Sequence, residues 1–202
     1  MKELLKKVTE GQNLTREEAA KAMDMMLEGT ASPVLVSAFL TALRMKGETI
    51  DEIVGCTEMM KSKGGSVKLD TDEYIDFVGT GGDGANSFNI STTSMFVCAA
   101  AGVTVAKHDN RAASSKSGAS DLLEALGANI MLEPKQVEQC INETGMGFMN
   151  AMKFHKAMKN VGPIRKEIGI RTIFNMLGPL SNPSNASRQV FSRLKKSAFL
   201  LR

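Results

Sequence analysis

The sequence predicts an α/β protein in which a small N-terminal helical domain precedes an α/β domain with a mostly parallel sheet. Two observations lead to this fold class. The first 66 residues carry helix start and stop signals and no strand pattern, whereas after residue 72 short apolar strands alternate with helices. A chain of 202 residues with 43% hydrophobic composition is long enough to bury a substantial core. We expect the helical domain at 1–66, the α/β domain at 67–190 and an atypical basic tail at 191–202.

Each of the three helices expected in the first domain begins with a capping signal, namely Thr15 with Glu18, Ser32 with Pro33, and Thr49 with Glu52. Glycines at 29, 47 and 64 can end these helices. The first two helices each carry an apolar face, formed by Ala19, Met23, Met26 and Leu27 and by Leu35, Phe39, Leu40 and Leu43. The pattern predicts a helical bundle.

The second domain reads as an alternation of strands and helices. We expect strands at 75–78, 103–106 and 129–132, and helices at 91–101, 119–126 and 134–143. Short apolar strands separated by helices predict a largely parallel sheet that is covered on both faces. In such sheets ligands bind beyond the carboxyl ends of the strands.

Composition and charge argue against several classes of protein. The formal net charge is only +3 and the lysines are scattered, so we do not expect nucleic-acid binding. Cys56, Cys98 and Cys140 lie far apart and form no metal-ligand spacing, which argues against a zinc site or a disulfide framework. The first residues are too charged for a signal peptide, and no apolar run is long enough to span a membrane. We expect a cytoplasmic protein.

A glycine-rich turn, Gly79-Thr80-Gly81-Gly82-Asp83-Gly84, directly follows the first expected strand. Its glycines allow an anion to approach the backbone amides closely, although a purely structural loop is the alternative. Asn89-Ile90-Ser91-Thr92 then begins the next helix, where free amides and the helix dipole favour an anion. Ser91 and Thr92 are also common helix-capping residues, and we expect them to serve both roles.

The second expected strand is followed by Lys107-His108-Asp109-Asn110-Arg111 and then by Ser114-Ser115-Lys116-Ser117-Gly118. This loop brings cations and hydroxyls to the same sheet edge as the glycine turn. A solvated basic loop is the alternative, but two such loops at one edge favour a polyphosphate ligand. His108 is a candidate polar contact within it.

In order and spacing, these segments resemble the anthranilate phosphoribosyltransferase family. The resemblance includes the glycine turn, Phe88 to Thr92, the loop from Lys107, Asp121 to Ala128, Phe154 to Lys159, Val161 to Arg165, and Arg171 to Leu180. It extends to about Val190. It implies transfer of the phosphoribosyl group of phosphoribosyl pyrophosphate to the amine of anthranilate, in tryptophan biosynthesis, by a homodimer that pairs through the helical domain.

The resemblance also implies the roles of individual residues. The expected contacts with phosphoribosyl pyrophosphate are Gly79, Gly82, Asp83, Ser87, Asn89, Ile90, Ser91, Thr92, Lys107, His108, Asp109, Asn110, Arg111, Ala112, Ala113, Ser114, Ser115 and Ala119. Those with anthranilate are Gly79, Asn110 and Arg165. Ser91 is expected to bind Mg²⁺, and Lys107 and Ser91 are the expected catalytic residues. A guanidinium such as that of Arg165 suits the carboxylate of an aromatic acid.

The sequence departs from the family pattern at several points. Asp109 stands where the family usually has glycine, and we expect its carboxylate to weaken donor binding unless it turns outward or meets Lys116 or magnesium. Ser87 replaces a threonine and keeps the hydroxyl. The segment after Val190 resembles a frame change or a premature end, and the acidic pair that holds magnesium in the family is absent, so we expect the sheet to be incomplete at the C-terminus.

Two other functions remain open from the sequence. One is a non-catalytic fragment that retains partial ligand binding or a dimer surface. The other is a relative of the pyrimidine-nucleoside phosphorylases, which share the architecture and a similar glycine loop. Asn110 and Arg165 argue against the second.

Overall fold

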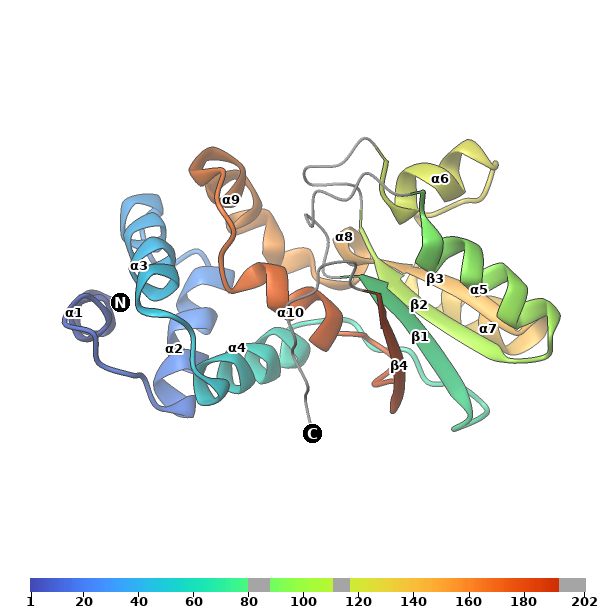
Figure 1. Ribbon diagram of the computed structural model, residues 1–202, viewed down its shortest axis with the longest axis horizontal. Helices are drawn as coiled ribbons and strands as arrows, with labels where there is room; N and C mark the ends of the chain where they lie inside the picture. The colour runs from blue at the N-terminus through green and yellow to red at the C-terminus, as the bar shows by residue number, and fades with distance from the viewer. Residues whose placement is uncertain (80–87, 111–116, 193–202) are drawn as a thin grey trace.

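The computed structural model describes residues 1–79, 88–110 and 117–192, and it consists of a helical part joined to a sheet part (Figure 1). The helical part begins with α1 (Lys2–Thr9), α2 (Arg16–Leu27), α3 (Pro33–Lys46) and α4 (Ile50–Ser62). Both predicted capping boxes are present, at Thr15 and Thr49, and the Ser32 hydroxyl accepts from the Leu35 amide. Gly47 follows α3 with φ of 88°, a conformation that favours glycine.

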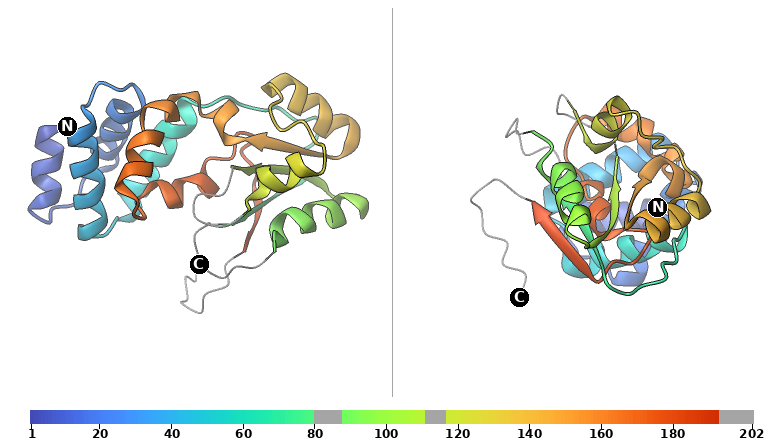
Figure 2. Two further views of the ribbon diagram at one scale, coloured as in Figure 1. Left: turned by 90° about the horizontal axis from the view of Figure 1, so that it is seen from above. Right: turned by 90° about the vertical axis from the view of Figure 1, so that its right-hand side faces the viewer.

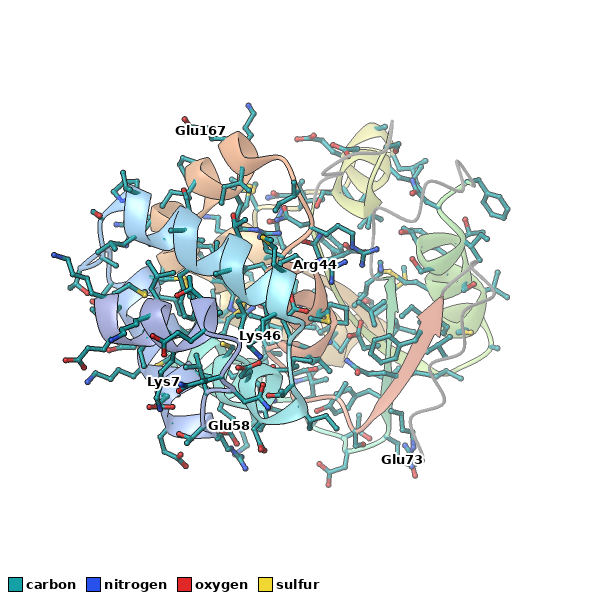
Figure 3. The ribbon with its side chains drawn as sticks, turned by 60° about the vertical axis from the view of Figure 1, so that its left-hand side comes forward. Lys7, Arg44, Lys46, Glu58, Glu73 and Glu167 are labelled. Atoms are coloured by element: carbon teal, nitrogen blue, oxygen red, sulfur yellow. The ribbon has the colours of Figure 1, made fainter. Side chains whose placement is uncertain are left out.

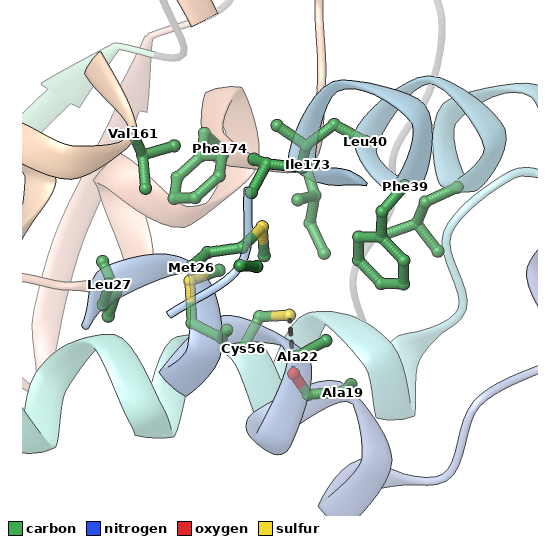
Figure 4. Close-up of a cluster of buried hydrophobic side chains, with 14 of the residues drawn as sticks. Ala19, Ala22, Met26, Leu27, Phe39, Leu40, Cys56, Val161, Ile173 and Phe174 are labelled. Atoms are coloured by element: carbon green, nitrogen blue, oxygen red, sulfur yellow. Dashed lines mark hydrogen bonds between the residues drawn. The ribbon is translucent and has the colours of Figure 1, made fainter. Parts of the chain in front are cut away.

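The core of the helical part is completed by residues that follow about a hundred positions later. Side chains of α2, α3 and α4 share one buried cluster with Val161, with Ile164 of α9 (Gly162–Ile168), and with Ile173 and Phe174 at the start of α10 (Phe174–Leu180). Figure 4 shows Val161, Ile173 and Phe174 beside Met26 and Leu40. Leu35, expected on the buried face of α3, is only half-buried, and its neighbour Val36 is buried instead.

Four parallel strands form the sheet in the order β3-β2-β1-β4. They are β1 (Tyr74–Gly79), β2 (Thr104–Asp109), β3 (Met146–Asn150) and β4 (Arg188–Ser192). The α/β fold with a mostly parallel sheet is therefore confirmed.

The two faces of the sheet are covered by different helices (Figure 2). Helix α5 (Ile90–Ala100) covers one face, where Met95 packs with Phe77 and Val105. Helix α7 (Pro134–Thr144) covers the other face, where its apolar residues pack with Ala106 and Met149. Val105 and Ala106 are consecutive and point to opposite faces, as the pleat of a strand requires. Shorter helices complete the described part: α6 (Ala119–Ala125), α8 (Ala151–Phe154) and a 3-10 helix (Lys156–Asn160).

The strand expected at 129–132 is wrong. This segment is a turn in which the Met131 amide donates to the Asn129 side chain at 3.0 Å, and Ile130 alone is well buried. A run of four residues is too short for apolar periodicity to distinguish a strand from a turn. The next strand after β2 is instead β3, which begins directly after Gly145 ends α7 in the left-handed conformation. The expected helices at 91–101, 119–126 and 134–143 are confirmed to within one residue.

Within the described ranges, no helix has the length and apolar character needed to cross a membrane.

Candidate functional site

The site predicted from the sequence lies at the carboxyl edge of the sheet, where β1 ends at Gly79 and β2 ends at Asp109. These two strands are neighbours and run parallel. The outer strands end at the same level, because Gly79 at the end of β1 pairs with Ser192 of β4, and Asp109 at the end of β2 pairs with Asn150 of β3. Parallel pairing therefore brings the loops that follow β1 and β2 to one edge.

Lys107 is fully buried, and its ammonium lies between two oxygen atoms. It donates to the Phe77 carbonyl oxygen at 2.6 Å and to Oδ2 of Asp109 at 2.8 Å. Lys107 and Asp109 are two positions apart in β2, so their side chains leave the same face of the sheet. The Asp109 carboxylate thus pairs with Lys107, an arrangement that the sequence analysis did not predict. Lys116, which was one of the predicted partners, lies outside the described residues.

The start of α5 is tied to the segment that precedes α6. The Asn89 side-chain amide donates to the Ser117 hydroxyl at 3.2 Å and to the Gly118 carbonyl at 3.3 Å. The Ser120 amide reaches the Asn110 carbonyl at 3.5 Å. These bonds bring the start of α5 close to Asn110, just after the end of β2, and to the residues that begin α6.

Two buried hydroxyl groups near this junction lack partners among the described residues. Asn89 is the residue that precedes α5, and its side chain makes no capping bond to the helix amides of the described residues. Ser91, in the first turn, is half-buried. The buried hydroxyls of Thr92 and Ser120 have no hydrogen-bond partner among the described residues. Buried polar groups without partners are rare, and they mark places where a ligand or water can bind.

Two buried histidines pack against each other beneath the edge. The rings of His108 and His155 meet edge-to-face with centroids 5.1 Å apart. Burial, reinforced by His155, lowers the pKa of His108 to about 3, against the raising effect of a hydrogen bond with the Gly178 backbone. Burial also lowers the pKa of His155, whose Nε2 lies 3.2 Å from the Ser181 carbonyl. Burial therefore favours the neutral form of both imidazoles, and a neutral His108 can serve as a hydrogen-bonding group.

Asp76 organises the edge and was missed by the sequence reasoning. It is buried in β1, accepts the His108 amide at 3.2 Å and accepts the Gln189 side chain at 3.1 Å. Burial raises the pKa of its carboxyl, while these and other hydrogen bonds and Lys107 oppose the rise. A charged residue inside the apolar run Ile75-Asp76-Phe77-Val78 was the signal that pointed to it.

Arg165 comes from α9, on the helical side of the molecule (Figure 1). Its guanidinium carbon lies 4.9 Å from the centre of the Phe174 ring, and burial lowers its pKa. No carboxylate of the described residues lies within ion-pair distance of it. A half-buried guanidinium that is stacked on a ring, with no carboxylate partner in the described part of the chain, is suited to an anionic ligand.

Several predicted site residues fall outside the described ranges, namely Gly82, Asp83, Ser87, Arg111, Ala112, Ala113, Ser114 and Ser115. The meeting of Gly82 with Lys107 therefore stays a prediction. In residues 1–79, 88–110 and 117–192, no three His, Cys, Asp or Glu side chains are grouped so that they could hold a metal ion.

Both parts of the chain match known protein families. Residues 71–200 match the glycosyl transferase family, a/b domain, and residues 2–64 match the glycosyl transferase family, helical bundle domain. The match to the first extends into the segment expected to be an atypical tail.

Named relatives and solved structures agree with this match. Anthranilate phosphoribosyltransferase of Acetivibrio thermocellus is 56% identical over 94% of this chain and 55% of its own length, and that of Anaeromyxobacter sp. (strain K) is 52% identical over 94% and 56%. The chain thus spans about half the length of the curated relatives it matches.

Two solved structures superpose closely on the chain. Anthranilate phosphoribosyltransferase from Thermus thermophilus matches with a TM-score of 0.87 and 44% identity, over 93% of this chain and 57% of the other. The Saccharomyces cerevisiae enzyme in complex with PRPP and Mg matches with a TM-score of 0.82 and 31% identity, over 91% and 55%.

Proposed function

The chain belongs to the glycosyl transferase family that joins a helical bundle to an α/β domain, and we propose that it serves the transfer of a phosphoribosyl group from phosphoribosyl pyrophosphate to the amine of anthranilate. The relatives named above carry this activity in their names. The proposal places this chain in tryptophan biosynthesis in the cytoplasm.

One observation carries the donor half of the proposal: two neighbouring strand ends present amides, hydroxyls and a lysine to one edge. The Asn89 bonds to Ser117 and Gly118 join the start of α5 to the residues just before α6, and Lys107 lies near the end of β2. A phosphorylated sugar needs such a convergence, because one helix end contributes only about 0.3–2 kcal/mol toward an anion. Thr92 and Ser120 add hydroxyls that have no other partner among the described residues.

The acceptor half of the proposal depends on Arg165. Anthranilate carries a carboxylate next to its amine on an aromatic ring. The guanidinium of Arg165 is held over Phe174 and is free of other carboxylates in the described part of the chain, so it can form a bidentate pair with that carboxylate. Such a pair fixes the direction in which the amine points, with Asn110 and Gly79 as the other proposed contacts.

The proposed reaction is a displacement at the anomeric carbon of the ribose. The anthranilate nitrogen forms a bond to this carbon, and the carbon–oxygen bond to pyrophosphate breaks with its electron pair on the leaving group. The nitrogen then gives up one proton, to the departing pyrophosphate or to water. Charge therefore accumulates on pyrophosphate, and Lys107 is the described cation placed to stabilise it. No covalent nucleophile is required.

Magnesium is the proposed companion of the donor, as in the yeast complex with PRPP and Mg. Ser91 offers one neutral oxygen for it, whereas Mg²⁺ is usually held by one or two carboxylates together with substrate phosphates. The described residues therefore do not fit a complete magnesium site, and no step of the reaction is assigned to the metal.

The decisive experiment follows the fluorescence of anthranilate in the presence of phosphoribosyl pyrophosphate and Mg²⁺. The proposal expects donor-dependent loss of the signal. Calorimetry with the donor alone is run on the same folded sample. Donor binding without turnover would restrict the chain to ligand binding, and absence of both would refute the proposal.

We also propose a homodimer that pairs through the helical part. Val34 and Met45 are 77% and 84% exposed and lie on the same face of α3, and Ile50, at the start of α4, is 76% exposed. Light scattering of the wild type and of Met45→Lys tests this pairing. The wild type is expected to have twice the monomer mass, and the variant to shift toward the monomer.

A further inference from the structure

The ion pair between Lys107 and Asp109 blocks the cation that the proposed donor site needs. Oδ2 of Asp109 lies 2.8 Å from the ammonium, and Oδ1 accepts the Asn110 amide at 2.8 Å. Both oxygens of the carboxylate are thus fixed by neighbours in the same strand and loop. Of the three hydrogens of the ammonium, one points to this carboxylate and one to the Phe77 carbonyl.

The two partners differ in their exposure to solvent. The Lys107 side chain is 0% exposed, whereas that of Asp109 is 30% exposed at the strand end. A polyanion that approaches this edge therefore meets the carboxylate first and reaches the ammonium only where the carboxylate gives way. The pair has no net charge, so it attracts phosphate much less than an unpaired lysine would.

We propose that Asp109 acts as an internal counter-ion that competes with the phosphates of the donor for Lys107 and so sets the donor affinity of this chain. The inference rests on the proposed function for the identity of the donor, but its physical content is competition between one carboxylate and any pyrophosphate group. It assigns to Asp109 a positioning role, because this residue acts through Lys107.

The test compares Asp109→Asn with the wild type. The asparagine keeps the size of the side chain and an oxygen for the Asn110 amide but removes the charge. Isothermal titration with inorganic pyrophosphate and Mg²⁺, and separately with phosphoribosyl pyrophosphate, gives the dissociation constants. Asp72→Asn removes an equal charge from an exposed loop and is the matched control. Asp109→Gly is the second variant, should the asparagine impair folding.

We expect both Asp109 variants to bind pyrophosphate about fivefold to tenfold more tightly than the wild type, and the control to bind as the wild type does. The gain should shrink as salt is added, because Asp109 is partly exposed. In a Lys107→Met background, Asp109→Asn should tighten pyrophosphate binding by less than about twofold, because the ammonium for which the carboxylate and pyrophosphate compete is then absent.

Equal or weaker pyrophosphate binding by the Asp109 variants would overturn the inference; weaker binding would indicate that the carboxylate itself contributes to a magnesium complex. An undiminished gain in the Lys107→Met background would overturn competition as its cause. Absence of pyrophosphate binding in all variants would overturn it as well. The proposed function is decided separately, by the turnover of anthranilate.

Discussion

The helical bundle and the carboxyl edge of the sheet each contain a buried lysine paired with a carboxylate, and the two pairs differ in how the carboxylate is satisfied. In the bundle, Lys46 lies 3.0 Å from Glu52, where α3 meets α4 (Figure 3). Glu52 is 0% exposed and also accepts the amides of Leu14 and Thr49. Burial tends to raise its pKa, but these bonds and Lys46 together lower it below the ordinary value.

At the sheet edge, several buried polar atoms near the corresponding pair in the sequence lack partners among the described residues. Asp109 is partly exposed, and the buried atoms His108 Nε2, Thr92 Oγ1 and Ser120 Oγ lie nearby in the chain without hydrogen bonds to any described residue. The carboxylate of the bundle pair is thus buried and fully occupied by donors, although Glu48 Oε1, close to it in the chain, also lacks a partner among the described residues. The carboxylate of the edge pair is instead partly exposed at a strand end. The comparison teaches that burial of a lysine in an ion pair does not by itself indicate the role of the pair; the exposure and the hydrogen bonds of its carboxylate do.

The largest effect is expected from breaking the bundle pair. Glu52→Ala leaves the amides of Leu14 and Thr49 without their acceptor and removes the only carboxylate that the Lys46 ammonium contacts among the described residues. It should lower the free energy of unfolding by about 3–5 kcal/mol. Urea unfolding followed by circular dichroism measures this loss. A loss below about 1 kcal/mol would place the pair with ordinary surface ion pairs and remove the contrast.

The matching change at the sheet edge should affect function instead. Lys107→Met removes the cation placed to stabilise pyrophosphate, and kcat for anthranilate should fall by about 10²–10³-fold, as for the loss of one transition-state donor. Lys46→Met is the control, which should lower stability while leaving the kinetics of the folded protein unchanged. Equal kinetic effects of the two lysine variants would contradict the assignment of roles.

A smaller effect is expected from Arg165→Lys. Lysine keeps the charge but loses the bidentate geometry and the stacking on Phe174. The KM for anthranilate should rise about tenfold to a hundredfold, with the KM for phosphoribosyl pyrophosphate unchanged. A rise confined to the donor KM would move Arg165 to the other half of the site.

Local signals explain why much of the fold was predictable. A capping box such as that of Thr15 and Glu18 depends only on four consecutive residues, and it is present in the structure as predicted. The glycine turn and the loop from Lys107 could be placed at one sheet edge because strand ends of a parallel sheet share an edge. The turn at 129–132 was misread because an Asx hydrogen bond outweighs four residues of apolar pattern.

Contacts between distant segments could not be predicted. The packing of Ile173 and Phe174 into the bundle joins residues separated by more than a hundred positions, and nothing in their local sequence indicates this partner. The stacking of Arg165 on Phe174 depends on the same packing. Lys107 and Asp109 are two positions apart, so their shared face was readable, but the burial that turns them toward each other depends on the whole sheet.

The last prediction concerns the neutral histidines of the edge, whose effect is small within any one pH unit. The folded pKa values of His108 and His155 are lowered, so the unfolded chain binds more protons as the pH falls below about 6.5. The contribution of His108 to stability is complete above that pH and is lost as the pH falls toward about 3, its folded pKa. His108 should therefore remove up to about 1.4 kcal/mol of unfolding free energy per pH unit in this window, and His155 should add a loss of the same sign below about pH 6.5.

His155→Gln separates the two contributions, because glutamine can keep a donor near the Ser181 carbonyl but does not titrate. Urea unfolding at pH 7.5, 6.0 and 5.0 should show a shallower loss of stability in the variant than in the wild type. The bundle offers the control: Glu52→Gln should lower stability at all three pH values without changing the slope between them, because the pKa of Glu52 lies below this range. Identical slopes in the wild type and His155→Gln would show that His155 is protonated equally in the folded and unfolded chain, and the sheet edge would then be as closed as the bundle.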